Sequence, residues 1–138
     1  MPEIIADHAQ SEQDADAIVA FLTEHSDAAG EPWNPIPFAF TLKEGERICG
    51  GVTGNINRGW MFVSILAVDE KLRGQGWGEK LMARAEEHAR ENNCSGLWLD
   101  TFSFQAPKFY QKLGFEEFGS LPNYPGDQTR HFYCKKFI

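Results

Sequence analysis

The sequence predicts an α/β fold with an antiparallel front half and one β-α-β unit in its middle. Two observations lead to this prediction. Up to residue 68, short apolar segments are separated by turn signals, which is typical of a meander of antiparallel strands. From residue 77, apolar side chains recur at helical spacing and a short apolar strand follows, which is typical of a β-α-β unit. The predicted order of elements is β-α-β-β-β-α-β-α-β-β.

Chain length and composition predict one soluble domain. A chain of 138 residues, 42% of them apolar, can bury one hydrophobic core, so we expect residues 1–138 to form a single domain. No apolar stretch reaches the roughly 20 residues of a spanning helix, and the first residues do not resemble a signal peptide. We therefore expect a cytoplasmic location. Cys49, Cys94 and Cys134 form no CxxC pair, so we expect free thiols and no metal site.

The front half is expected to contain a strand, a helix and a three-stranded meander. Residues 3–6 are predicted to form the strand. Residues 14–25 are predicted to form the helix, because Ala17, Ile18, Phe21 and Leu22 recur at helical spacing. Proline and glycine residues mark 28–37 as a loop. The strands of the meander are predicted at residues 38–43, 47–55 and 60–68.

The second half is expected to alternate helices and strands. A helix is predicted from Trp77 to about Asn92, and His88 on its apolar side is expected to pack against the core rather than act in catalysis. Ser103 is expected to cap a second helix at about residues 104–113. The remaining strands are predicted at residues 96–101, 115–121 and 129–137.

The charge of the chain is negative and unevenly distributed. The net charge of −7 argues against binding to nucleic acid or to an anionic membrane. Residues 1–50 contain ten acidic and two basic residues, whereas the rest of the chain is nearly neutral. This acidic front half indicates either a site that attracts a cationic ligand or a solvated helix face, and both interpretations stay open.

The segment between the strand at 60–68 and the following helix carries the clearest chemical signal. Gly74, Gly76 and Gly78 allow the backbone to turn tightly before the helix starts. The amides of such a loop, with the positive end of the helix dipole behind them, suit an anion such as a pyrophosphate. The alternative is a glycine-rich helix start that binds no ligand.

Two other phosphate-binding motifs fit this segment less well. A P-loop would need GxxxxGK[ST], which is absent. A dinucleotide fingerprint would need GxGxxG, and Gly74 and Gly76 fit it, but Glu79 stands at the third glycine position. Asp100 lies where a ribose-binding acid would be expected, so a dinucleotide-binding domain remains the second interpretation. The antiparallel strands that precede the motif argue against it.

Two motifs resemble those of the GNAT superfamily of N-acetyltransferases. Arg73-x-x-Gly76-x-Gly78 is similar to the acyl-CoA signature [QR]-x-x-G-x-[GA], and residues 106–115 resemble A-x-x-[LF]-Y-x-K-x-G-F. The resemblance implies the GNAT fold, which is a mixed, mostly antiparallel central sheet flanked by helices, with a splayed strand pair that binds acyl-CoA. It is closest to a little-characterised bacterial branch, so it does not name the acceptor.

The resemblance implies acetyl-CoA as co-substrate and assigns residues to it. Ala67 and Val68 would pair with the pantetheine. Ser103 stands where many relatives carry an asparagine, so it would make a similar hydrogen bond or serve only as a helix cap. The pyrophosphate would be held by Arg73, Gly74, Gln75, Gly76, Trp77 and Gly78.

The resemblance also implies a catalytic acid, Tyr110, which would protonate the departing thiolate. The alternative for Tyr110 is a purely structural core aromatic. Some relatives carry a catalytic glutamate on the strand before the glycine loop, but residues 60–68 contain no carboxylate. Asp100 acting through water is therefore the candidate base, together with an acid from the front half, and His131 stays undecided.

In this family the acceptor site is built largely by the first helix, the loop after it and the late strands. Glu24, Asp27 and Glu31 are expected to attract a cationic amine, and Trp33 and Asn34 to line its pocket. The expected activity is acetyl transfer from acetyl-CoA to a primary amine of a small molecule or peptide, by direct attack in a ternary complex. An acyl-CoA-binding sensor without catalysis is the alternative. Exposed late strands make a homodimer possible.

Overall fold

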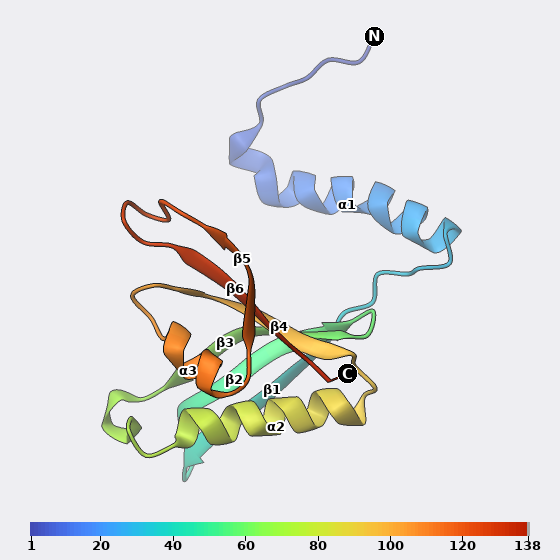
Figure 1. The fold of residues 1–138 in the computed structure, drawn as a ribbon. Coiled ribbons are helices and arrows are strands. Elements are labelled where there is room, and N and C mark those ends of the chain that lie inside the picture. Colours follow the sequence, from blue (N-terminus) through green and yellow to red (C-terminus); the bar gives the residue numbers. More distant parts are fainter. Residues whose placement is uncertain (138) are drawn as a thin grey trace. The chain divides into compact units, whose positions relative to one another are not determined.

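The computed structural model describes residues 1–137 and divides into two compact units, Met1–Asn34 and a second unit that begins at Pro35 (Figure 1). The first unit consists of a short 3-10 turn, η1 (His8–Gln10), followed by the helix α1 (Ser11–Ala28). The predicted helix at 14–25 is confirmed and extends further at both ends. The single domain expected from the sequence stays a prediction.

The predicted strand at residues 3–6 is wrong. The backbone there is irregular, and the side chains of Ile4 and Ile5 are exposed. Within the described part of the chain, the strand ladders run only from Ile36 to Lys136. A short segment becomes a strand only when a neighbour pairs its backbone groups and its apolar side chains are buried, and neither condition is met here.

The second unit is built on a six-stranded mixed sheet with the order β1-β2-β3-β4-β6-β5. Its strands are β1 (Ile36–Glu44), β2 (Arg47–Asn57), β3 (Trp60–Val68), β4 (Gly96–Phe102), β5 (Glu116–Leu121) and β6 (Arg130–Lys136). Its helical elements are η2 (Glu70–Leu72), α2 (Trp77–Glu91) and α3 (Pro107–Lys112). Only the β3–β4 pair is parallel, so the predicted meander and the β-α-β unit are both confirmed.

The parallel pair β3–β4 separates after a short ladder. Its register covers only Trp60–Phe62 against Gly96–Trp98. Beyond that point β3 continues to pair with β2 as far as Val68, and β4 continues to pair with β6 as far as Phe102. The two halves of the sheet therefore splay apart on the side where β3 leads into η2.

One face of the sheet is covered by α2, which contacts β1 to β4. The buried residues of α2 are Leu81, Met82, Ala85 and Ala89, which lie on one side of the helix as predicted. The ring of His88 lies 5.7 Å from Phe38 and 5.5 Å from Phe40, so its predicted packing role is confirmed. This packing holds the N-terminus of α2 beside the end of β3.

The third helix, α3, begins later than predicted. It starts at Pro107 rather than near residue 104, its N-cap position is Ala106, and no side chain caps it. The expectation that Ser103 caps this helix is therefore wrong. Proline at the first helical position is favourable because its fixed φ suits the helix and its missing N–H is not needed there. Tyr110 of α3 belongs to the same buried cluster as Leu97 and Leu99 of β4.

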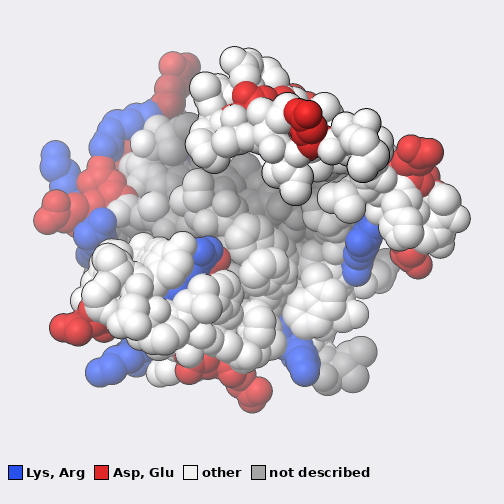
Figure 2. Space-filling model, turned by 90° about the horizontal axis from the view of Figure 1, so that it is seen from above, with Lys and Arg blue, Asp and Glu red and all other residues white. Residues whose placement is uncertain are grey.

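The surface carries both signs of charge. Figure 2 shows both lysine or arginine side chains, in blue, and acidic side chains, in red. Among residues 1–137, no helix has the length and apolar content to cross a bilayer. The same residues contain no cluster of three or more potential metal ligands. The three cysteines are free thiols, as predicted.

Candidate active site

The loop between β3 and α2 has the backbone geometry that its glycines predict. Gly74 and Gly76 have φ values of +78° and +83°, in the left-handed region that favours glycine. Gly76 is the N-cap of α2, and its carbonyl oxygen accepts the N–H of Lys80 as the helix begins. The amides of the first turn, at residues 77–79, precede this bond and have no partner within the helix. They form the positive end of the α2 dipole.

The entrance to this loop is held by Asp69. One of its carboxylate oxygens accepts the N–H of Lys71 at 3.0 Å, and the other pairs with Arg47. The pKa of Asp69 is lowered below its ordinary value. The hydrogen bond from Lys71 is the largest cause, and the hydrogen bond from Arg47 is the next largest. Asp69 is thus a turn residue. Directly after η2, Nε of Arg73 donates to the carbonyl oxygen of Val68 at 3.3 Å.

A cavity of about 540 Å³ lies where β3 ends and α2 begins. Among the residues predicted to bind acetyl-CoA, those that line it are Ala67, Val68, Arg73, Gly74, Gly76, Trp77 and Gly78. Gln75 and Ser103 do not line it. The structure thus brings most of the predicted cofactor residues to one place.

A second cavity, of about 360 Å³, lies between the splayed ends of β3 and β4. Residues 63–66 line it from β3, and residues 99–101 line it from β4. It shares Leu66, Ala106 and Phe109 with the first cavity, so the two adjoin. Together the two cavities extend from the glycine loop to Tyr110.

Tyr110 lines the second cavity from α3 and is 9% exposed. Its ring packs against Phe109 and Phe115 at near-perpendicular angles and lies 6.5 Å from the ring of Tyr133. The pKa of Tyr110 is raised above its ordinary value of 10.0. Burial of the hydroxyl is the larger cause, and the negative charge of Asp100 is the smaller one. The hydroxyl therefore keeps its proton into alkaline solution, as a proton donor requires.

Asp100 lines the same cavity, and its side chain is 16% exposed. Its Oδ1 accepts a hydrogen bond from Nε of Arg130 at 3.0 Å, and Nη1 of Arg130 also donates to the Tyr124 hydroxyl at 3.2 Å. The bond to Asp100 is the main cause of a raised Arg130 pKa. Its role as a base acting through water stays a prediction.

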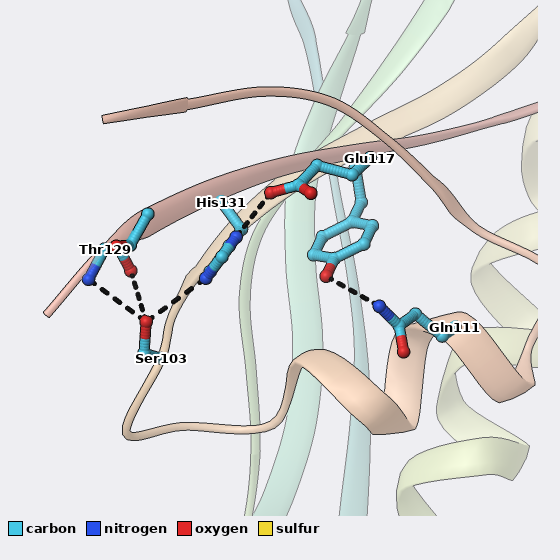
Figure 3. Close-up of polar contacts among 6 residues, drawn as sticks. Ser103, Gln111, Glu117, Thr129 and His131 are labelled. Atoms are coloured by element: carbon cyan, nitrogen blue, oxygen red, sulfur yellow. Dashed lines mark hydrogen bonds and ion pairs between the residues drawn. The ribbon is translucent and has the colours of Figure 1, made fainter. Parts of the chain in front are cut away.

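Sequence reasoning missed a group of side chains around Ser103. Figure 3 shows Ser103, His131 and Glu117 in a row, with hydrogen bonds between successive members. Nothing in the sequence marks Glu117, because it reaches His131 across the β5–β6 pair, where the register shifts between Glu117 and Gly119. Such an irregularity has no sequence signal here. The role of Ser103 in cofactor binding stays a prediction.

The predicted acceptor residues all lie in the first unit. Glu24 and Asp27 are on α1, and Glu31, Trp33 and Asn34 are in the segment that follows it. Their part in acceptor binding stays a prediction.

The comparisons with known proteins agree with this geometry. A family model described as "Acetyltransferase (GNAT) family" matches residues 5–115. The chain belongs to this family. It is 41% identical over 105 residues to a blasticidin-S acetyltransferase of Streptomyces morookaense, which covers 74% of this chain and 77% of the relative.

Solved structures of bacterial acetyltransferases show the same fold. An acetyltransferase from Bacillus cereus superposes with a TM-score of 0.79 and 29% identity, covering 99% of this chain and 98% of that one. A structure from Bacillus anthracis, provisionally designated a streptothricin acetyltransferase, contains acetyl coenzyme A; its TM-score is 0.67 at 26% identity, covering 75% and 64% of the two chains. The predicted GNAT fold and acyltransferase class are thus confirmed.

Proposed function

We propose that this GNAT protein transfers the acetyl group of acetyl-CoA to a primary amine of a small molecule or peptide, by direct attack in a ternary complex. The observation that carries the proposal is the pair of adjoining cavities, with the glycine loop at one end and Tyr110 at the other. The named substrate of one relative, blasticidin S, supports a small-molecule acceptor.

The glycine loop is the proposed site of the acetyl-CoA pyrophosphate. The unpaired amides at the start of α2 and the helix dipole both favour negative charge there. Backbone donors also explain how a chain with a net charge of −7 binds a polyanion. Arg73 adds a guanidinium, although its Nε is held by the carbonyl oxygen of Val68.

The splay between β3 and β4 is the proposed site of the pantetheine and the thioester. Past Phe62, β3 has no ladder with β4 among the described residues, so its backbone on that side is available to the amide groups of pantetheine. Leu66 and Phe109, which line both cavities, supply apolar contacts to the thioester end. Tyr110 then lies beside the sulfur.

The chemistry follows from these positions. The neutral amine attacks the thioester carbonyl carbon, so that an N–C bond forms and the C–S bond breaks. The departing thiolate takes the proton of the Tyr110 hydroxyl. The acylated nitrogen loses its extra proton to give the amide, and solvent returns a proton to Tyr110. A phenol whose pKa is raised above 10.0 transfers its proton only as negative charge builds on sulfur in the transition state.

The test is the release of free CoA thiol from acetyl-CoA across a panel of polyamines, aminoglycosides, nucleoside amines and short peptides. The substitution Tyr110→Phe is expected to lower kcat by about 10²-fold or more, with the Kd for acetyl-CoA little changed. Tyr133→Phe is the matched control, because Tyr133 is buried in the same cluster, and its hydroxyl accepts a hydrogen bond from Gln111.

Each outcome has a clear meaning. Amine-dependent release that falls in Tyr110→Phe and persists in Tyr133→Phe supports the proposal. An unchanged kcat in Tyr110→Phe removes this residue from the mechanism. Acetyl-CoA binding without release for any amine points to an acyl-CoA-binding module and contradicts the proposed transfer.

A further inference from the structure

For a neutral His131, hydrogen-bond donors can be assigned along the row Ser103–His131–Glu117. An ionised Glu117 can only accept, so Nδ1 of His131 carries the proton and donates to Oε1 of Glu117. In the neutral imidazole, Nε2 then has a free lone pair, and it lies 3.1 Å from Oγ of Ser103. Nε2 can therefore accept the proton of the Ser103 hydroxyl.

The Ser103 oxygen keeps one lone pair for another partner. A serine hydroxyl has one proton and two lone pairs. The N–H of Thr129 occupies one lone pair at 3.0 Å. The carbonyl oxygen of Thr129, which accepts the Ser103 N–H at 2.9 Å, lies 3.2 Å from Ser103 Oγ and is a second acceptor for the hydroxyl proton beside His131. With the proton directed at His131, the second lone pair is available to a proton from a substrate.

This row is connected to residues that line the cavity between β3 and β4, here named the thioester cavity, although its own three residues do not line it. Ser103 stands in the short connection between Thr101 and Gln105, and both of these residues line that cavity. Thr101 is also the register partner of His131 in the β4–β6 ladder. The next residue on the same side of β6, Tyr133, has its ring 6.2 Å from His131 and 6.5 Å from Tyr110.

Acetyl transfer to an alkylamine needs a group near the thioester that accepts the proton of the amine. An alkylammonium with a pKa near 10 costs about 4 kcal/mol to deprotonate at neutral pH, so its proton requires an acceptor. Tyr110 cannot be that acceptor, because its raised pKa keeps it protonated. In Asp100, Oδ1 is already bonded to Arg130.

We propose that Ser103 and His131 form the relay that removes the proton of the acceptor amine, with Glu117 positioning His131. The amine proton passes to Oγ of Ser103 as the hydroxyl proton passes to Nε2 of His131. Glu117 stabilises the resulting imidazolium, which then releases its proton to solvent. The inference rests on the proposed function, because it concerns an amine acceptor, and it adds the route of the proton.

The surroundings of His131 contain few other groups that titrate. From β5, Glu117 contacts it, and Ser120 is its uncharged register partner. From β4, Thr101 and Ser103 face it and carry no charge. Along β6, the ring of Tyr133 lies beside His131, and the ring of Tyr110 from α3 lies beside Tyr133.

The experiment compares His131→Gln, Ser103→Ala and Glu117→Gln with the wild type, using an alkylamine acceptor found in the panel. At about pH 7 we expect His131→Gln and Ser103→Ala to lower kcat by about 10²-fold or more, with the Tm little changed in both and the Kd for acetyl-CoA little changed in His131→Gln. Glu117→Gln should lower kcat less. Ser120→Ala is the control, since it removes a neighbouring hydroxyl that faces His131 but is not in the row.

The pH profile separates a relay from a structural role. As pH rises towards the pKa of the amine, more of the acceptor is already neutral and needs no base. The deficit of His131→Gln and Ser103→Ala should therefore shrink by about tenfold or more between about pH 7 and pH 9. It should also be smaller at about pH 7 for a weakly basic acceptor such as hydrazine.

Several results would overturn the relay. A wild-type kcat in His131→Gln, or a deficit that is the same at every pH, contradicts proton removal by this row. The pH-dependent deficit appearing in Asp100→Asn instead assigns the base to Asp100. An acetyl group found on Ser103 by mass spectrometry after incubation with acetyl-CoA alone makes this serine a nucleophile. A wild type that acetylates no amine overturns the relay together with the proposed function, whereas unaffected variants of an active wild type overturn the relay alone.

Discussion

The substitution Gly76→Ala tests whether the backbone of the glycine loop binds acetyl-CoA. Gly76 has φ +83°, and a Cβ built there meets no atom within 4 Å. The methyl group therefore causes no collision, and the whole effect comes from holding an alanine in the left-handed region. That conformation costs about 1–2 kcal/mol.

This strain can relax in the free protein, because Gly74 and Gly76 are exposed at the start of α2. Acetyl-CoA must then restore the left-handed conformation when it binds. A cost of about 1–2 kcal/mol corresponds to a Kd that is about 5- to 30-fold higher. We expect this loss of affinity in Gly76→Ala, with only a small change in Tm.

Gly59→Ala is the matched control. Gly59 has φ +82°, and its Cβ position is equally open, but it lies in the turn between β2 and β3. This turn is closed by the Asn57–Trp60 pair, and the Gly59 carbonyl accepts the N–H of Ser95, so the strain cannot relax. Gly59→Ala should lower the Tm by roughly 3–8 °C and leave the Kd unchanged.

Isothermal titration with acetyl-CoA and thermal unfolding of both variants provide the two readouts. A wild-type Kd in Gly76→Ala would refute the reasoning, because the left-handed turn would then contribute nothing to acetyl-CoA binding. An equal rise in Kd in Gly59→Ala would also refute it, because the effect would not be local to the loop.

Two further predictions concern stability. Met61 is fully buried in the core cluster, so Met61→Ala should lower the free energy of unfolding by about 2–5 kcal/mol, measured by urea denaturation, and a loss under about 1 kcal/mol would show that the core is not packed around it. Asp69 has a lowered pKa, so it stabilises the folded protein above its ordinary pKa of 3.8, and this contribution is lost as pH falls below that value. The difference in Tm between the wild type and Asp69→Asn should therefore shrink between about pH 7 and pH 3, and a constant difference contradicts the assignment.

Elements whose signal is local could be predicted from the sequence. The apolar spacing around Leu81 and Ala85 predicts α2 and the side that it buries, because a helix forms contacts between residues three and four apart. The glycines at 74 and 76 predict the loop, because their backbone conformation depends on the absence of a side chain. The resemblance to the GNAT motifs then adds the expected ligand.

Predictions that depended on distant partners were less successful. Residues 3–6 contain two isoleucines, but no described strand pairs with them. Ser103 has the side chain of a helix cap, yet Thr129 and His131 engage its hydroxyl instead. In both cases the residue type allowed two outcomes, and the contacts available in the folded chain decided between them.

By itself, the sequence determined the β-α-β unit, the glycine loop, the position of Tyr110 after it and therefore the family. Only the tertiary structure decided how far β3 and β4 pair, which opens the thioester cavity, and that Glu117 reaches His131 and Ser103. The physical reason is that periodicity and backbone preference act within a few residues of the chain. The width of a splay and the alignment of side chains on β4, β5 and β6 depend on registers between strands far apart in sequence.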